Sequence, residues 1–243
     1  MAQDRRVYDR GALVRDDPQE HSLYLVFTGH EYADGGRVIR DVLRRHAIPA
    51  SFFFTGDFYR DPAQSALIHA LRADGHYLGA HSDRHLLYAA WENRDSLLVS
   101  REEFIQDLAD NYRALEAFGI RREDAPVFLP PYEWYNDSIA LWTRAEGLTL
   151  INYTPGTSSH ADYTTPLMGA RYLSTDSIFA RILRYEQLAP AGLNGFILLL
   201  HIGTHSDRTD KFYHRLDELL SVLKGRGYGF KRFAPVRPTP SER

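Results

Sequence analysis

Cysteine is absent from this chain of 243 residues. A disulfide scaffold, a thiolate metal site and a cysteine nucleophile are therefore excluded. The absence says little about the compartment, because it suits the cytosol and the exterior alike. The sequence also has no apolar run close to the roughly 20 residues that a membrane-spanning helix needs. The motifs G-x-S-x-G and G-x-x-x-x-G-K-[ST] are missing too, so neither a nucleophile elbow nor a phosphate-binding loop is expected.

A strong excess of charge is also missing. The formal net charge is −3 and no basic block occurs, so a nucleic-acid-binding surface has no electrostatic basis here. The first ten residues, MAQDRRVYDR, are charged and lack an apolar core, so we expect no secretory signal at this start. An apolar content of 44% over this length is typical of one large or two small globular domains.

Strand-like and helix-like segments alternate between a polar lead-in, residues 1–22, and a proline-rich tail, residues 234–243. The expected strands lie at 23–28, 50–56, 77–80, 127–131, 148–152, 196–201 and 228–233, and the expected helices begin near residues 36, 66, 100, 139, 174 and 212. This alternation predicts crossover units and a mostly parallel sheet. About seven such units favour a closed or nearly closed βα barrel over residues 23–233 rather than an open, doubly wound sheet.

Ionisable side chains follow most of the expected strands. In either architecture, functional residues lie at the carboxyl ends of the strands. The polar residues at these positions are His30, Glu31, His81, Asp83, His85, Tyr132, Glu133, Asn152, His160, Asp162, His201, His205 and Asp207. Two interpretations remain open: solvated turns, or the mouth of an active site.

The pair His81 and His85 is the first candidate for metal binding. Two imidazoles four residues apart lie on one face of a helical turn, so both can point at one ion. Neutral imidazole suits Zn, Co, Ni or Fe. Among 11 histidines such a pair can also arise by chance. His201 directly follows four apolar residues, where it is either a hydrogen-bonded core residue or a general acid or base, since its ordinary pKa is near 6.5.

The order of several motifs resembles that of the polysaccharide deacetylases, the NodB-homology domain of carbohydrate esterase family four. The segment DGHYLGAHSDRH is similar to that family's Gly-His-Glu-Ile-Gly-Asn-His-Ser/Thr-x-x-His segment. The other similar segments are IPASFFFTGDF, FLPPYEWYN, FILLLH and LLSVLKGRGYGFKRF. The resemblance spans residues 23–233, nearly the whole chain.

The resemblance implies a distorted (β/α)7 barrel and metal-assisted hydrolysis of an N- or O-acetyl group on a sugar. In the family, one Asp and two His hold a divalent ion, usually zinc; cobalt or nickel would also suit the imidazoles. A second Asp is the base, a backbone N–H holds the oxyanion and a late His protonates the leaving sugar. Carried over, His81 and His85 match the metal ligands, His201 matches the acid and the backbone of Tyr132 matches the oxyanion donor.

The first motif of the family, Thr-Phe-Asp-Asp-Gly, is changed in this chain. Counting back from ASFFF without a gap, the two Asp positions are Thr28 and Gly29. The family's Arg that orients the base is Leu129, and the motif's Gly is Glu133. An arginine left beside a missing carboxylate would be an unpaired buried charge, which is strongly destabilising. Losing both together therefore favours a rebuilt site, although a non-catalytic descendant would also lose both.

His30 could replace the lost ligand. With His81 and His85 it would complete a three-histidine site that leaves a position open for water. In that case Glu31 or Glu133 is the base. Alternatively, Glu31 is the third ligand and Glu133 the base, and the sequence does not choose.

Four further residues are expected to contact substrate: Trp134, Tyr135, Asp162 and His205. The aromatic segment YEWYN would flank a sugar groove, with Trp134 or Tyr135 as a platform, or its rings would pack against the neighbouring helix. Asp162 and His205 follow expected strand ends.

Three functions remain open, of which a metal-dependent carbohydrate deacetylase is favoured. The second is a barrel that kept the groove but lost the chemistry and binds carbohydrate, with Trp91, Trp134 and Trp142 available for stacking. The third keeps the metal but hydrolyses an amide of a non-sugar substrate. Family members usually act on wall or extracellular polymers, which implies export within a longer precursor, although the sequence begins with no export signal. The oligomeric state is left open.

Overall fold

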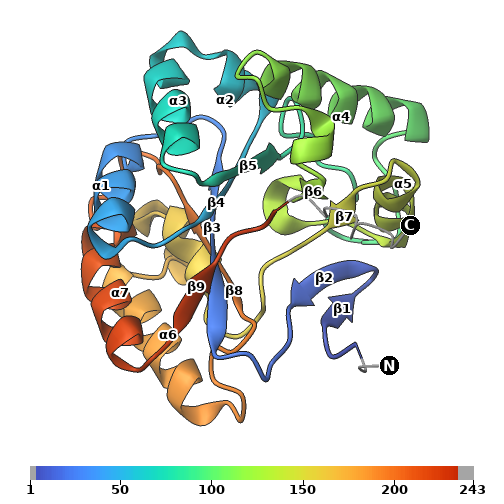
Figure 1. The fold of residues 1–243 in the computed structure, drawn as a ribbon. Helices are drawn as coiled ribbons and strands as arrows, with labels where there is room; N and C mark the ends of the chain where they lie inside the picture. Colours follow the sequence, from blue (N-terminus) through green and yellow to red (C-terminus); the bar gives the residue numbers. More distant parts are fainter. Residues whose placement is uncertain (1–3, 235–243) are drawn as a thin grey trace, which may run out of the picture.

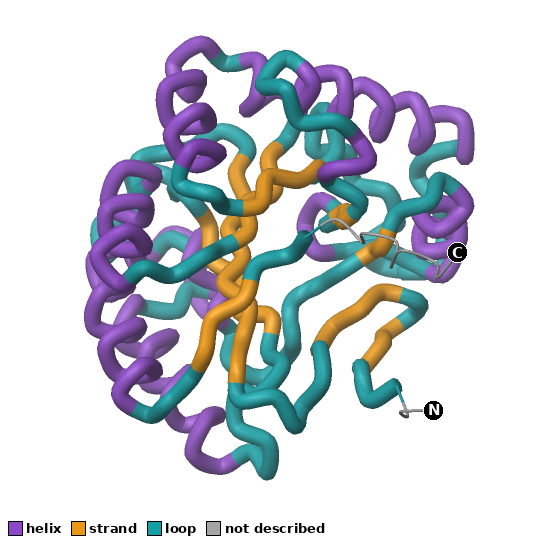
Figure 2. Tube along the Cα trace, viewed as in Figure 1, coloured by secondary structure: helices purple, strands orange, loops and turns teal. Residues whose placement is uncertain are grey.

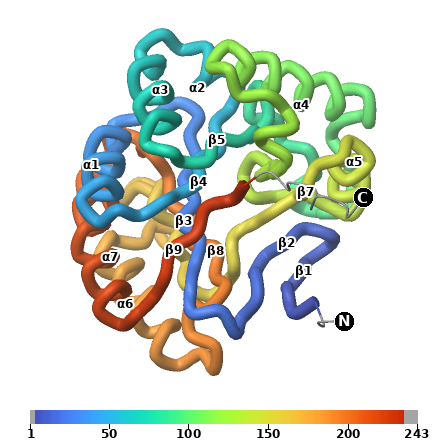
Figure 3. The backbone as a smooth tube through the Cα atoms, viewed as in Figure 1, coloured from blue at the N-terminus to red at the C-terminus, as the bar shows by residue number. Residues whose placement is uncertain are grey.

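A curled sheet of seven parallel strands forms the centre of the molecule in the computed structural model, which describes residues 4–234 (Figure 1). The strand order is β7-β6-β5-β4-β3-β8, and β9 pairs with the first half of β3. The bounds are β3 (Ser22–Gly29), β4 (Ser51–Phe54), β5 (Tyr77–Ala80), β6 (Val127–Phe128), β7 (Thr149–Leu150), β8 (Ile197–His201) and β9 (Gly229–Lys231). The expected barrel-like α/β fold is confirmed. Figure 3 shows β9 running beside β3, as the pairing requires.

The described part of the chain contains seven α-helices. They cover the outside of the sheet (Figure 2). They are α1 (Gly36–His46), α2 (Gly56–Arg60), α3 (Ser65–Ala73), α4 (Arg101–Glu116), α5 (Asp137–Ala145), α6 (Thr175–Leu188) and α7 (Leu216–Gly225). The start of α4 follows from its sequence, because Ser100 and Glu103 form a reciprocal capping box. None of the helices in residues 4–234 combines the length and apolar character that crossing a bilayer requires.

The strands are apolar on both faces because helices and barrel interior cover them. Phe52, Phe53 and Phe54 of β4 are all fully buried, and the ring of Phe27 stacks on Phe52 with centroids 5.1 Å apart. This packing fixes the sheet and leaves the loops after the strands free to vary in sequence.

An N-terminal hairpin closes the gap between the two ends of the sheet. It consists of β1 (Val7–Asp9) and β2 (Ala12–Arg15). β2 forms single bridges from Leu13 to Ile151, after β7, and from Arg15 to Phe196, before β8. Residues 12–15 lie within the expected lead-in, yet Ala12, Leu13 and Val14 are buried. Their partners lie more than a hundred residues away, so a local pattern carried no sign of them. Of the expected tail, residues 235–243 lie outside the described residues.

Candidate active site

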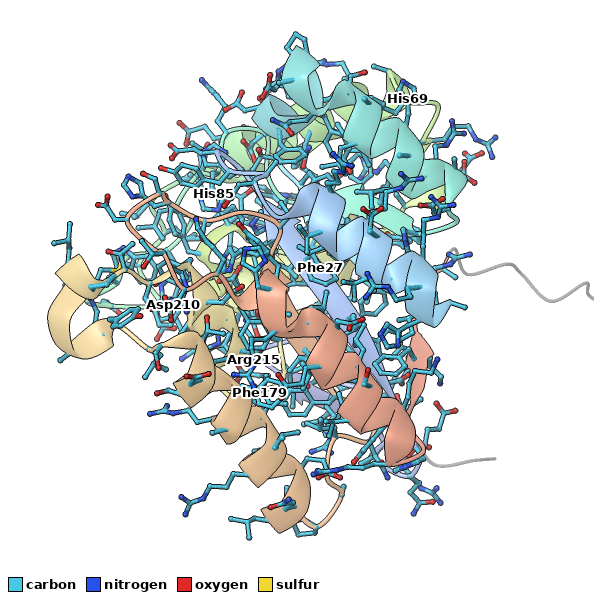
Figure 4. All side chains as sticks on the ribbon, turned by 90° about the vertical axis from the view of Figure 1, so that its left-hand side faces the viewer. Phe27, His69, His85, Phe179, Asp210 and Arg215 are labelled. Atoms are coloured by element: carbon cyan, nitrogen blue, oxygen red, sulfur yellow. The ribbon has the colours of Figure 1, made fainter. Side chains whose placement is uncertain are left out.

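A cavity of about 1030 Å³ opens at the carboxyl ends of the strands. Its walls come from the loops after β3, β5, β6 and β8 and from two 3₁₀ segments, η4 (Ser159–Tyr163) and η5 (Pro166–Arg171). The lining includes His30, Glu31, His81, His85, Trp91, Tyr132, Glu133, Tyr163, Leu167, His201 and His205. Figure 4 shows His85 away from α1 and α7, on the side where these loops gather. The structure thus brings most of the expected site residues into one cavity.

His81 is buried and firmly oriented. Its backbone N–H donates to Oδ1 of Asn111 on α4 at 2.8 Å, and its Nδ1–H donates to the Leu129 carbonyl at 2.8 Å. The second bond fixes the tautomer, so Nε2 is the nitrogen left to bind a ligand. A carbonyl partner on the other ring nitrogen is typical of metal-binding histidines. Burial lowers the pKa of His81 to about 3, so the ring is neutral at physiological pH.

His85 reaches the same place through a loop, not through a helical turn. The expected helical face at residues 81–85 is wrong, because Ser82 and His85 both adopt left-handed backbone conformations, with φ of 70° and 56°. Non-glycine residues in this region are uncommon and concentrate at functional sites. Burial, with a smaller contribution from His81, lowers the pKa of His85 to about 2.

The three imidazoles lie close together, and the spacing of two of them is compatible with one shared ion. Two imidazoles on one tetrahedral ion have ring centroids roughly 5 Å apart for a metal–nitrogen distance of about 2.1 Å. His81 and His85 meet this requirement, with centroids 5.1 Å apart and planes at 61°. His30 instead stacks on His85, with centroids 4.7 Å apart and planes within 9° of parallel. A single ion cannot lie in the planes of two stacked rings.

The expected three-histidine set is therefore not assembled as the side chains stand. Across residues 4–234, no group of three or more His, Asp or Glu is placed to hold a metal ion. The ring spacing of His81 and His85 is compatible with one shared ion, and no third side chain among the described residues joins them in a metal-holding group. His30 directs Nδ1 toward Oγ1 of Thr55 at 3.2 Å.

Glu133 occupies the cavity wall after β6 in a strained turn. Tyr132 and Glu133 have φ of 58° and 53°, so that with His85 three residues in the cavity lining are left-handed. Burial disfavours the charged carboxylate and raises the pKa of Glu133 to about 7, against a smaller opposing effect of His201. A carboxyl group with such a pKa can exchange a proton with water near neutral pH.

His201, at the end of β8, is held by Asp162 of η4. Asp162 accepts a bond from the ring Nδ1–H of His201 at 2.6 Å and another from its backbone N–H at 2.9 Å. Burial alone would lower the pKa of His201, but the Asp162 carboxylate outweighs it, so the pKa is raised above 6.5. The Asp162 side chain is only 3% exposed and lies outside the cavity lining, and each of its oxygens accepts one bond from His201, so the structure shows it as the group that orients His201.

Comparison with known proteins places this fold and cavity in a family. The family model described as polysaccharide deacetylase matches residues 15–151. The chain belongs to the polysaccharide deacetylase family. It is 26% identical over 223 residues to the peptidoglycan-N-acetylmuramic acid deacetylase PdaA of Bacillus subtilis, covering 90% of this chain and 73% of PdaA. It is also 26% identical over 215 residues to a chitooligosaccharide deacetylase of Sinorhizobium fredii, covering 85% of this chain and 87% of that one.

Solved structures share the fold at low sequence identity. The structure of B. subtilis PdaA, a family 4 carbohydrate esterase, has a TM-score of 0.70 at 20% identity and covers 92% of this chain and 83% of its own. BA3943 of Bacillus anthracis, described as a family 4 pseudoenzyme, has a TM-score of 0.69 at 18% identity, with coverages of 93% and 68%. Both similarities establish the polysaccharide deacetylase fold. They do not bear on the reaction, which is argued from the site residues.

The positions that the resemblance aligns with the family's charged residues, Thr28, Gly29 and Leu129, have surroundings that differ from one another. Thr28 is 1% exposed, lines the cavity and has no hydrogen-bond partner for Oγ1 among the described residues. At Gly29 an added Cβ would lie 2.8 Å from Ile202 and 2.9 Å from Phe54, so no larger residue fits without a shift. Leu129 is fully buried in apolar surroundings. The three positions that the resemblance aligns with the family's Asp, Asp and Arg thus carry no charged side chain.

Trp134 and Tyr135 of YEWYN lie outside the lining of the cavity, whereas Tyr132 of the same segment is part of it. Tyr135 is fully buried and donates its hydroxyl to the Asp9 carbonyl at 2.9 Å, so its predicted role as a platform is wrong. Trp134 is half-buried, donates Nε1–H to the Ala90 carbonyl at 3.3 Å and lies outside the lining. Trp91, considered in the sequence only as one of the tryptophans available for stacking, lines the cavity instead.

Glu31 and His205 are both exposed at the cavity rim, which leaves their predicted roles as base or ligand and as substrate contact open.

Proposed function

We propose that this chain hydrolyses acetyl groups from an acetylated carbohydrate. The observation that carries the proposal is the convergence, in one cavity, of a carboxyl group with a pKa near 7, Glu133, and an Asp-held histidine, His201. Hydrolysis of an acetyl group needs a proton acceptor for water and a proton donor for the leaving group. These two side chains have environments suited to the two tasks.

His81 and His85 would hold a divalent ion, for which zinc is the expectation and cobalt or nickel are alternatives. Bound there, the ion would supply polarisation of the acetyl carbonyl. The remaining coordination positions are not assigned to protein side chains, because His30 stacks on His85.

Glu133 takes a proton from the attacking water, and His201 gives its Nε2 proton to the sugar oxygen or nitrogen as the bond to the acetyl carbon breaks. Asp162 keeps His201 in the tautomer with Nδ1–H and stabilises its protonated form. The backbone N–H of Tyr132 makes no backbone hydrogen bond within residues 4–234 and is available to the developing oxyanion.

Acetate release tests the proposal. Purified chain loaded with Zn, Co or Ni is incubated with O-acetylated xylo-oligosaccharides and N-acetylglucosamine oligomers, and free acetate is measured. We expect release from at least one series and none from His201→Ala. No release from any substrate with any of the three metals would reject the proposal.

A binding protein without turnover is the second candidate, because the Asp–Asp–Arg set is gone and a pseudoenzyme shares the fold. Oligosaccharide binding that survives His81→Ala and His201→Ala, with no acetate released by wild type, would favour it.

A further inference from the structure

Trp91 lies at the edge of the cavity on a loop that packs as a unit. In this loop the Ala90 N–H donates to Ser96 and the Leu98 N–H donates to Tyr88, each at 2.9 Å, and Ala89 bridges to Leu97. The Trp91 side chain is 53% exposed, although its loop is ordered by these bonds.

The Trp91 ring packs against Trp134, which in turn packs against Arg94. Trp134 lies against it with ring centroids 5.5 Å apart, and the guanidinium of Arg94 lies 4.7 Å from the centre of the Trp134 ring. Arg94 is itself fixed, because its Nε–H donates to the Tyr135 carbonyl at 2.6 Å. A large aromatic ring held in this way loses little conformational entropy when a ligand covers it.

The exposed ring is continuous with the reaction centre. Tyr132 contacts His85 on one side, with centroids 4.3 Å apart, and Trp91 on the other at 5.6 Å. Tyr132 therefore lies between Trp91 and the pair His81 and His85. A ligand whose acetyl group is at these histidines must extend further to reach Trp91. The cavity lining also includes the exposed residues Tyr163 and Leu167.

We propose that Trp91 is a stacking platform for a sugar ring next to the one that carries the acetyl group, so that the site prefers an oligosaccharide over a single sugar. The apolar face of a pyranose ring covers an aromatic ring well, while its hydroxyls remain in water. The rim carries two carboxylates, Glu31 and Asp207, and one guanidinium, Arg171, and this mixture of few charges suits an uncharged chain. This inference rests on the proposed carbohydrate substrate.

Length-dependent binding tests the platform. Dissociation constants are measured by calorimetry for N-acetylglucosamine oligomers of one, two, four and six units and for O-acetylated xylo-oligosaccharides of the same lengths. For Trp91→Ala, we expect about fivefold to tenfold weaker binding of the hexamer of the series that binds, with the single sugar changed less than twofold. Trp91→Phe should restore most of the loss.

Leu98→Ala is the matched control, because Leu98 lies on the same loop, is 54% exposed and is not part of the lining. It should leave every dissociation constant unchanged. The platform is rejected if Trp91→Ala binds the hexamer as wild type does, if all lengths weaken equally, or if wild type binds no member of either series. Length-dependent binding without acetate release would reject the proposed hydrolysis and keep the platform.

Discussion

The two neighbouring strands β3 and β8 end in very different ways. At the end of β8, His201 has both its ring and its backbone bound by Asp162. At the end of β3, its register partner Thr28 has a buried hydroxyl without a hydrogen-bond partner among the described residues, and His30 stacks on another imidazole. The β8 side therefore presents an imidazole that a carboxylate orients, whereas the β3 side carries no carboxylate at the two positions, Thr28 and Gly29, that the resemblance aligns with the family's Asp residues.

The difference indicates which functional groups of a site can be supplied from another strand. A general base needs only a carboxylate within reach of water, so a residue from another strand can supply it. Glu133, after β6, faces the same cavity and stands where the family motif has glycine. The loss of the Arg at Leu129 fits this change, because a buried guanidinium without its carboxylate would be destabilising.

The largest effect is expected on the β8 side. Asp162→Asn removes the carboxylate that raises the pKa of His201, so burial then lowers that pKa. We expect acetate release to fall on the order of 100-fold, and the high-pH limit of kcat/KM to move to lower pH. An unchanged high-pH limit would show that Asp162 does not set the protonation of His201.

Introducing the family's charged residues at Thr28 and Leu129 should change the free energy of unfolding. Thr28→Asp and Leu129→Arg each bury a lone charge and should each reduce the free energy of unfolding by about 2–4 kcal/mol. The double variant should recover at least about 1 kcal/mol of the sum, because the two charges pair. Urea denaturation of all four proteins measures this coupling, and strict additivity would mean that the two positions no longer face one another.

Zinc binding distinguishes His85, an expected ligand, from His30, which stacks on it. Saturating Zn should raise the Tm of wild type by about 5–10 °C. His85→Ala should abolish the rise, and His30→Ala should keep most of it because His30 stacks instead of facing the ion position. Calorimetric melting curves with and without Zn check this. Loss of the rise in His30→Ala would mean that the stacked ring turns to become a ligand.

The smallest effect concerns the stability cost of Glu133. Its pKa is about 7 when folded and near 4.5 when unfolded, so the folded state is penalised as pH rises through this window. Glu133→Gln should therefore gain on the order of 1–2 kcal/mol at pH 8, after discounting for solvent in the cavity, and little at pH 5. Denaturation at both pH values measures it, and an equal gain at each would place the carboxyl group in water.

Much of the fold could be predicted because its signals are local. Apolar runs and the capping box at Ser100 located the strands and α4, and the rule for parallel sheets located the cavity. The contribution of β2 could not be predicted in this way, since its bridges to Ile151 and Phe196 join distant parts of the chain.

Within the site, residues placed by strand ends were predicted better than residues placed by turns. His81, His85 and His201 share the cavity because their strands end at one edge. Trp134 and Tyr135 follow a turn with left-handed conformations at Tyr132 and Glu133, and both lie outside the lining. Such conformations in non-glycine residues have no reliable sequence signal.

Acetate release by Glu133→Gln, compared with Glu31→Gln in the same metal-loaded preparation, tests the central claim most directly. Both variants remove one charge from the cavity lining, but Glu31 is exposed at the rim. We expect kcat to fall by about 100-fold or more in Glu133→Gln and by less than about threefold in Glu31→Gln. The reverse order would make Glu31 the proton acceptor and contradict the account.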